Sequence, residues 1–230
     1  IRAPHHTSSA VSLVGGGAYP RPGEISLAHR GILFLDEFPE FSRNVLESLR
    51  QPLEEGKITV SRASGSVTYP ARFMLMAAMN PCPCGNFNDP DKPCICSASV
   101  ILKYNKKVSG PLLDRIDIHI RVPRENIFSS APENNPESSE NIRLRVEKAR
   151  ETQLRRFSKE NILTNAEMSN KQIKKFCPLD SDAEKILVNY AISKHLSHRS
   201  FFKIIKLART AADLDESENI LSKHILQVIN

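Results

Sequence analysis

The chain changes its hydrophobic pattern near residue 124. Before that point it carries short apolar runs separated by Gly and Pro, a pattern typical of strands joined by turns. These runs are ILFL (32–35), ITV (58–60), FMLMAAM (73–79) and IDIHIRV (116–122). The segment 123–141 that follows is rich in Pro, Asn, Ser and Glu, which predicts a linker or a long exposed loop.

Beyond this segment the pattern is helical. The stretches 180–196 and 197–214 carry apolar residues three to four positions apart, which predicts helices with Asp180 and Ser197 as N-caps. The stretch 138–157 contains helix-forming residues without Gly or Pro. The expected fold class is therefore α/β, with an α/β core over 1–124, a linker over 125–140 and an all-helical domain over 141–230.

Two segments of the first part predict local insertions. β-forming residues alternate on both sides of Ala63-Ser64-Gly65, which predicts a β-hairpin. The segment SLVGGGAYPRPGEISL (12–27) has three consecutive glycines and two prolines, which marks a flexible loop or insertion.

The composition is that of a folded, soluble protein. Among the 230 residues, 40% are hydrophobic and 25% are charged. No apolar run approaches the roughly 18 residues that a membrane span requires, and no signal peptide is visible, so we expect no membrane contact and a cytoplasmic location. The net charge of +6 fits an anionic partner and an ordinary basic surface about equally well.

Two adjacent acids directly follow the first apolar run. Asp36 and Glu37 end ILFL, a run that suits a strand covered on both faces, as in a parallel sheet. Ligands of such sheets bind beyond the carboxyl ends of the strands, where nucleotide hydrolases use one acid to hold Mg²⁺ and the next to polarise the attacking water. Two surface turn residues would give the same pattern, and this stretch alone favours neither interpretation.

Three further polar residues fit either a phosphate site or ordinary structure. Asn80 ends the run FMLMAAM and would stand beside Asp36 if the two strands are neighbours; a turn Asn before Pro is the alternative. Arg115 is flanked by two aspartates and can stabilise charge on a phosphoryl group, although alone it favours a local ion pair. Arg199 lies in the first turn of a predicted helix, where a cation opposes the helix dipole, which favours a functional reason for it.

The order of these features resembles an AAA+ ATPase. Three long segments are similar to the competence-protein (ComM-type) branch of the bacterial magnesium chelatase-like family, and the resemblance covers nearly the whole chain. They are APHHTSSAVSLVGGGAYPRPGEISLAHRGILFLDEFPEF, LRQPLEEGKITVSRASGSVTYPARFMLMAAMNPCPCG and SGPLLDRIDIHIRVPR. The helical part looks like the C-terminal domain of that family.

The resemblance implies roles for the candidate residues. Asp36 and Glu37 match the Walker B acids, and Asn80 matches sensor 1. Arg115 matches the arginine finger, which acts on ATP held by the adjacent subunit, and Arg199 matches sensor 2 in the helical lid. The implied cofactors are ATP and Mg²⁺, and the implied assembly is a ring-shaped homo-oligomer, a hexamer.

The two insertions also have counterparts in the family. The hairpin at 58–70 matches a pre-sensor-1 hairpin, and the segment 13–25 matches the helix-2 insertion, both of which project toward a central pore in ring-shaped relatives. Basic clusters can follow a phosphate backbone without reading sequence, so Lys57 and Arg62 become candidates for DNA contact.

One motif of the family is missing from the sequence. No G-x-x-x-x-G-K-[ST] phosphate-binding loop occurs in the 230 residues, and the family carries this loop upstream of the APHH segment. We therefore expect the chain to be the C-terminal part of a longer protein, without the Lon-like N-terminal domain of the family, and to be inactive as an ATPase by itself. His5 and His6 of the APHH segment receive no role.

Four of the five cysteines occur as two C-x-C pairs. Cys82 and Cys84 are separated by nine residues from Cys94 and Cys96. Four thiolates can hold Zn²⁺ tetrahedrally, but structural zinc sites usually use C-x₂₋₄-C spacing, and residues i and i+2 of an extended chain point apart. Pro83 can turn the chain and remove this conflict. A zinc site and four reduced thiols in an exposed loop are about equally favoured.

The leading hypothesis is an AAA+ motor that couples ATP hydrolysis to DNA remodelling, as a branch-migration helicase in recombination or natural transformation. The alternative is a chelatase-like motor that remodels a partner protein. The third hypothesis is a scaffold that binds nucleotide without hydrolysis, and the intact Asp36, Glu37, Asn80 and Arg115 disfavour it.

Overall fold

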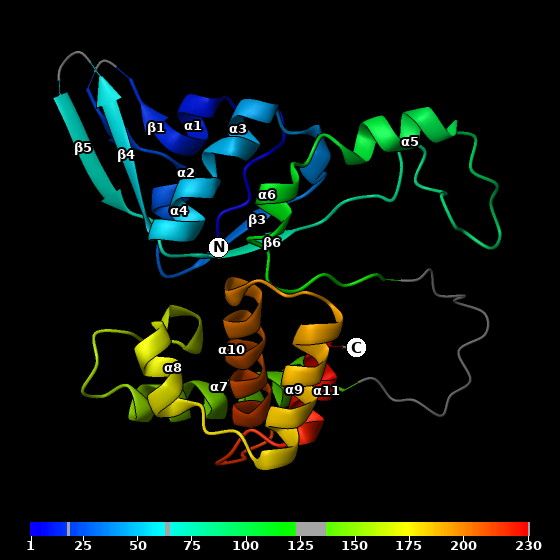
Figure 1. The fold of residues 1–230 in the computed structure, drawn as a ribbon. Coiled ribbons are helices and arrows are strands. Elements are labelled where there is room, and N and C mark those ends of the chain that lie inside the picture. The colour runs from blue at the N-terminus through cyan, green and yellow to red at the C-terminus, as the bar shows by residue number, and fades with distance from the viewer. Residues whose placement is uncertain (18, 63–64, 123–136, 230) are drawn as a thin grey trace. The chain divides into compact units, whose positions relative to one another are not determined.

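The chain folds into two compact units, Ile1–Glu125 and Asn126–Asn230. A computed structural model describes residues 1–17, 19–62, 65–122 and 137–229 (Figure 1). The expected linker over 125–140 lies mostly outside the described residues. Each unit has its own hydrophobic core, and the two cores share no residue.

The first unit mixes short strands with short helices, which confirms the expected α/β class. Its elements are α1 (Ala10–Val14), β1 (Gly15–Gly16), β2 (Arg21–Pro22), α2 (Glu24–Leu27), β3 (Ile32–Leu35), a 3₁₀ turn η1 (Phe38–Glu40), α3 (Arg43–Ser48), α4 (Arg50–Glu55), β4 (Lys57–Arg62), β5 (Gly65–Pro70), β6 (Met74–Ala77), α5 (Ala98–Asn105) and α6 (Gly110–Leu113).

The strands β3 and β6 are parallel neighbours, paired from Ile32–Met74 to Leu35–Ala77. Leu33 and Leu35 are fully buried, whereas the other two residues of β3 are half-buried. The N-terminal segment runs parallel to β3 on a single bridge: the Arg2 amide donates to the Ile32 carbonyl, and the Phe34 amide donates to the Arg2 carbonyl. Three chain segments therefore run in the same direction toward one edge.

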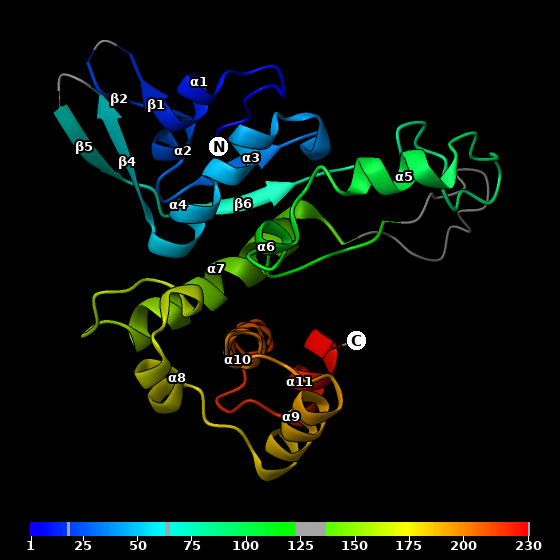
Figure 2. The same cartoon turned by 45° about the horizontal axis from the view of Figure 1, so that its top comes forward.

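The predicted hairpin is present as the antiparallel pair β4–β5, which projects from the unit (Figure 2). Ile58 and Val60 are buried on one face, and the hydroxyls of Thr59 and Thr68 meet at 3.0 Å on the other. The alternation of the sequence thus matches the pleat. The predicted turn residues Ala63 and Ser64 lie outside the described residues.

The glycine-rich segment forms more regular structure than a flexible loop. Between α1 and α2, the strands β1 and β2 pair antiparallel, with Gly15 opposite Pro22. A Cβ on Gly15 would stand 2.3 Å from the Arg21 carbonyl oxygen, and the residue has φ +108°. The glycine is needed here because the two backbones approach too closely for any side chain.

The last apolar run of this unit, IDIHIRV (116–122), forms no strand among its described residues. Ile118, Ile120 and Val122 are 60%, 79% and 83% exposed, so alternate apolar side chains face outward.

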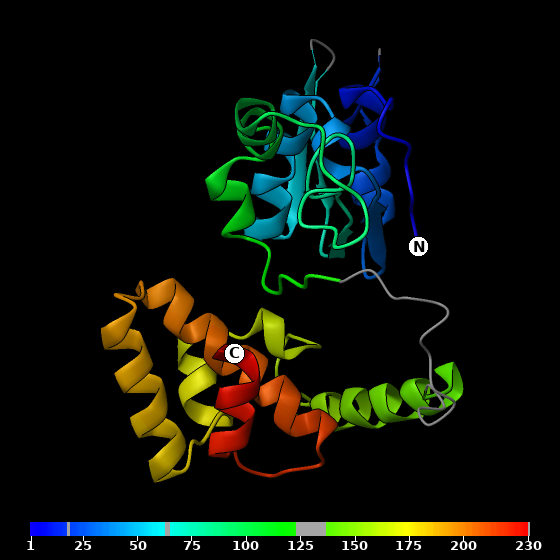
Figure 3. The same cartoon turned by 90° about the vertical axis from the view of Figure 1, so that its right-hand side faces the viewer.

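The second unit is all-helical, also as expected. Its elements are α7 (Ser139–Arg156), a 3₁₀ turn η2 (Asn165–Glu167), α8 (Asn170–Phe176), α9 (Ser181–Ser193), α10 (His198–Leu214) and α11 (Ser222–Ile229). Helix α10 packs against α7, α8, η2 and α11, and α9 packs on α11 (Figure 3). The predicted caps are confirmed: the side chain of Asp180 accepts from the Ala183 amide, and that of Ser197 from the Ser200 amide.

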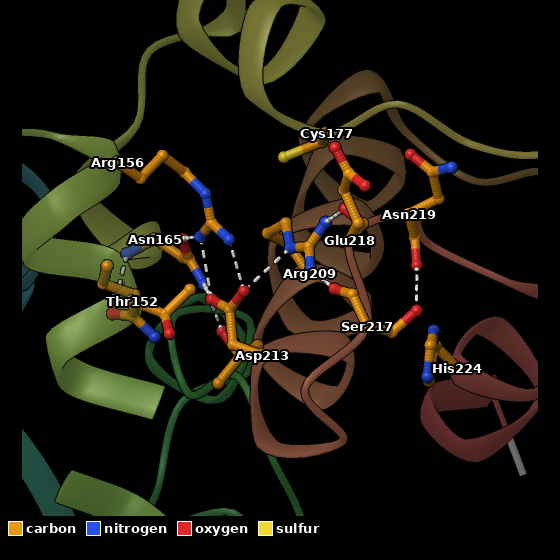
Figure 4. Close-up of polar contacts among 12 residues, drawn as sticks. Thr152, Arg156, Asn165, Cys177, Arg209, Asp213, Ser217, Glu218, Asn219 and His224 are labelled. Carbon is orange, nitrogen blue, oxygen red and sulfur yellow. Dashed lines mark hydrogen bonds and ion pairs between the residues drawn. The ribbon is translucent and has the colours of Figure 1, made fainter. Parts of the chain in front are cut away.

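A buried ion network joins the elements around α10 (Figure 4). Arg209 is 1% exposed; its Nε donates to Oδ1 of Asp213 at 3.0 Å, and its terminal nitrogens donate to the carbonyls of Ser217 and Glu218. Arg156 of α7 makes a two-pronged ion pair with Asp213. The interior of the helical unit therefore contains charged side chains as well as apolar ones.

No described helix is long and apolar enough to cross a membrane.

Candidate active site

The two predicted Walker B acids lie just beyond the last paired residue of β3. Both Asp36 and Glu37 are exposed, and the Glu37 amide donates to Oδ1 of Asp36 at 2.8 Å. Glu37 has left-handed backbone angles (φ 52°, ψ 44°), which are uncommon for a residue other than glycine. The chain turns sharply at this residue, and the turn leaves both carboxylates at the end of the strand.

Asn80 lies at the same edge, because it follows the neighbouring strand β6. The Ala78 amide donates to the Leu35 carbonyl, and the Ala78 carbonyl accepts from the Phe38 amide, so the parallel pairing continues past both strand ends. Asn80 is exposed two residues later.

The backbone of Asn80 is also tied to a buried tyrosine of α5. Burial, together with the charges of Glu40, Cys82 and Glu37, raises the pKa of Tyr104, and a hydrogen bond from the Asn80 backbone amide opposes the rise. Tyr104 is 6% exposed. Helix α5 is thereby connected to the position of Asn80.

His6 is a site residue that the sequence did not reveal. Its Nδ1 lies 2.7 Å from Oε2 of Glu37, and a carboxylate oxygen only accepts, so the imidazole donates. The ring stacks on His5 with centroids 4.1 Å apart and meets Phe41 edge-on. The APHH motif marked both histidines, but only the pairing of the N-terminal segment with β3 shows that His6 reaches Glu37.

Arg115 does not contact these acids. It follows α6, and its Nη2 pairs with Oε2 of Glu54 at 2.6 Å while Nη1 donates to the Pro111 carbonyl. The side chain is 13% exposed, and its buried Nε has no hydrogen-bond partner in the part of the chain that the structure describes. The arginine is held against α4 of its own chain. An ion pair within the chain was the alternative to a phosphoryl contact, although the partner is Glu54 and not one of the flanking aspartates.

Arg199 lies in the first turn of α10, after the Ser197 cap, and is exposed. It belongs to the second unit, whereas Asp36 and Glu37 belong to the first. Its role in nucleotide contact stays a prediction.

The two candidate DNA-contacting residues stand on β4. Lys57 is 56% exposed and lies 3.9 Å from the Glu55 carboxylate. Arg62 is exposed, and its Nη2 reaches the Gly15 carbonyl at 3.5 Å. Arg62 thus links the hairpin β4–β5 to the glycine-rich hairpin β1–β2.

The four clustered cysteines come together in space. Their sulfur atoms all lie within 4.8 Å of one another; the residues are Cys82, Cys84, Cys94 and Cys96. Hydrogen bonds from the backbone amides of Asn86 and Ile95 lower the pKa of the Cys84 thiol to about 6. The Cys96 amide donates to Cys94, but burial and the neighbouring sulfurs raise the pKa of the Cys94 thiol to about 12.

The comparisons with known proteins agree with these two units. Residues 1–129 match the family described as magnesium chelatase, subunit ChlI, and residues 136–230 match the C-terminal family of the same subunit. The chain is 42% identical over its whole length to the competence protein ComM of Haemophilus influenzae and to the uncharacterized protein YifB of Escherichia coli. It is 23% identical, over 88% of its length, to the DNA replication licensing factor mcm6 of Dictyostelium discoideum.

The chain spans 44% of the length of ComM and of YifB. The ChlI family match alone covers more than half of the chain, and the C-terminal match covers the helical unit. The chain therefore belongs to the magnesium chelatase ChlI family, which is part of the AAA+ ATPase superfamily.

Proposed function

We propose that this chain forms part of an ATP-hydrolysing AAA+ motor that remodels DNA. The observation that carries the proposal is the edge formed by β3 and β6, where Asp36 and Glu37 follow one strand and Asn80 follows its parallel neighbour. Ligands of open α/β sheets bind at this edge. The family match supports the motor, and the roles of these residues are part of the proposal.

The side chains at the edge fit a magnesium nucleotide. Mg²⁺ prefers oxygen ligands and is usually held by one or two carboxylates together with substrate phosphates. Asp36 is exposed and offers such a carboxylate, and Asn80 offers an amide oxygen nearby. When bound, Mg²⁺ neutralises negative charge on the phosphoryl oxygens.

Glu37 is the proposed general base. It would accept the proton of the attacking water, while Asn80 orients that water. His6 donates to Oε2 of Glu37 and so fixes the carboxylate, which leaves Oε1 as the oxygen that faces a water. In this proposal Oε2 of Glu37 holds the carboxylate in place through His6, and Oε1 accepts the proton.

Arg115 is the proposed finger for the nucleotide of a neighbouring subunit in a hexameric ring, and Arg199 is the proposed sensor from the helical unit. Arg115 must first leave Glu54, to which it is bound in the single chain. A guanidinium that arrives in trans places positive charge on the transferring phosphoryl group.

The proposed substrate is branched DNA during recombination or uptake of foreign DNA. Lys57 and Arg62 stand on a projecting hairpin where a phosphate backbone can pass. The names of two relatives, a competence protein and a DNA replication licensing factor, point to DNA as well. Remodelling of a partner protein is the other candidate, and the name of the family favours it.

The test is DNA-stimulated ATP hydrolysis by a protein of the relatives' full length that contains this chain. We expect Glu37→Gln to lower kcat by about 10²- to 10⁴-fold, because it removes the general base. The matched control is Glu147→Gln, which changes an exposed glutamate of α7 that pairs with Arg143. Equal turnover by wild type and Glu37→Gln would refute the assignment of Glu37.

Two further arms separate the substrates and test the chain itself. Stimulation by branched DNA supports DNA remodelling, whereas stimulation only by a partner protein supports the alternative. The 230-residue chain contains no phosphate-binding loop motif, so we expect no turnover from it alone.

A further inference from the structure

The two C-x-C pairs form one cluster of sulfur atoms. The Sγ of Cys82 lies 3.4 Å from that of Cys84 and 3.7 Å from that of Cys94, and the Cys84 and Cys94 sulfurs are 3.6 Å apart. The Cys96 sulfur lies within 4.8 Å of all three. A tetrahedral zinc ion with Zn–S bonds of about 2.3 Å requires sulfur–sulfur separations of about 3.8 Å.

We propose that these four thiolates bind one zinc ion in a structural Cys₄ site. Soft thiolates in a tetrahedral arrangement select Zn²⁺ or iron, and the closed set of four leaves no open position for catalysis. The sulfur atoms are too far apart to be bonded, because a disulfide needs a sulfur–sulfur bond of about 2.05 Å. The distance within the first pair, from Cys82 to Cys84, is similar to the distances from each of them to Cys94. The sulfurs therefore form one cluster and not two separate pairs.

The local backbone explains how a C-x-C pair can point two sulfurs at one place. After Cys82, the chain turns at Pro83, and the Gly85 amide donates back to the Cys82 carbonyl at 3.0 Å. Gly85 has φ +81°, which only glycine adopts without strain. The turn replaces the extended conformation in which alternate side chains would point apart.

The loop between the pairs is also held in shape. The Asp89 carboxylate accepts from the amides of Asp91 and Lys92 at 2.8 and 3.0 Å, a local turn that brings the chain back toward the first pair.

The position of the site gives it a structural task. The first pair begins two residues after Asn80, and the second ends just before Ser97, the N-cap of α5. A metal that closes this loop therefore constrains the chain between the end of β6 and the start of α5, including the backbone next to Asn80.

The experiment is metal analysis of the 230-residue chain, purified without chelator in reducing buffer. We expect about one zinc per chain, and less than about 0.1 in Cys84→Ser/Cys94→Ser, because two ligands of four are lost. The matched control is Cys177→Ala, which removes a buried thiol in the helical unit and should keep the zinc.

Two readouts on wild-type protein do not depend on the folding of a variant. Replacement by Co²⁺ should give thiolate-to-cobalt charge-transfer bands and the intense visible bands of a tetrahedral ion. Removal of the zinc by a chelator should speed amide hydrogen exchange in α5 and leave exchange in α10 unchanged, because metal binding stabilises the segment that it closes.

The outcomes decide the proposal. Less than about 0.2 zinc per chain after reconstitution, bound iron in place of zinc, or two disulfides formed from the four thiols would each overturn it. A cobalt spectrum of octahedral type, or equal zinc in wild type and in Cys84→Ser/Cys94→Ser, would overturn it too. One zinc per chain that the double variant loses and Cys177→Ala keeps supports it.

Discussion

The buried carboxylate of Asp213 should control the stability of the helical unit. Its side chain is 0% exposed and accepts from Arg156, Asn165 and Arg209, which belong to α7, η2 and α10 itself. Asp213→Asn keeps the shape of the side chain but removes the charge that balances two arginines. It also turns an amide NH₂ toward groups that only donate.

The expected loss follows from the burial of the remaining charges. Arg209 is 1% exposed and Arg156 is 14% exposed, so neither guanidinium can regain full hydration when the carboxylate disappears. Removal of one partner from a buried ion pair costs about 3–5 kcal/mol. For a unit of this size we expect the Tm to fall by roughly 10–30 °C.

The assay is hydrogen exchange of α10 amides at 25 °C, together with urea unfolding followed by circular dichroism. Exchange resolves the helical unit from the α/β unit, which a single global transition would not. The matched control is Asp182→Asn, because Asp182 pairs with Lys185 on the surface and is 72% exposed. We expect that control to change the free energy of unfolding by less than about 1 kcal/mol. If Asp213→Asn also stays within about 1 kcal/mol of wild type, a decisive role for the network is wrong.

Two further predictions concern titration and His6. Although burial opposes it, hydrogen bonds from Arg156 and Asn165 and the charge of Arg209 lower the pKa of Asp213. The stabilisation that ionised Asp213 provides is therefore present above the unfolded pKa of about 3.9 and is lost as the pH falls through the lower folded pKa. In acid unfolding below about pH 4, wild type should therefore lose more stability than Asp213→Asn. His6→Ala frees Oε2 of Glu37 and should lower kcat of a full-length protein by about tenfold with little change in KM, whereas His6→Asn, which keeps a donor, should recover part of it; equal kcat values for all three would contradict the role of His6.

The sequence predicted the elements whose causes are local. Alternating β-formers gave the hairpin β4–β5, and three-to-four spacing with a polar cap gave α9 and α10. These patterns succeed because strand pleat and helix capping depend on neighbours a few residues away. The pairing of the strands before Asp36 and Asn80, on which the placement of Asn80 depended, is confirmed, but it joins segments far apart in the sequence and no local pattern specified it.

The parts that the sequence did not predict depend on distant neighbours. His6 reaches Glu37 only because Arg2 bridges to Leu33, and a single bridge leaves no periodic pattern. Arg156 stands in a helix with several other Lys and Arg residues, but it is 14% exposed and paired with a residue 57 positions away. Composition cannot distinguish such a buried arginine from a solvated one.

The contact between Arg115 and Glu54 bears on how a ring could work. Glu54 is 49% exposed, and a pair with one wetted partner contributes about 1 kcal/mol or less. The buried Nε of Arg115 has no partner among the described residues, and such a donor costs about 1–3 kcal/mol. The ion pair with Glu54 and the hydrogen bond to the Pro111 carbonyl favour the bound position, and the unsatisfied Nε opposes it. A nucleotide in a neighbouring subunit would have to favour the released position by more than the net difference, because a ligand moves such an equilibrium by its differential affinity. The placement of Arg115 against its own chain is therefore compatible with a finger that acts in trans.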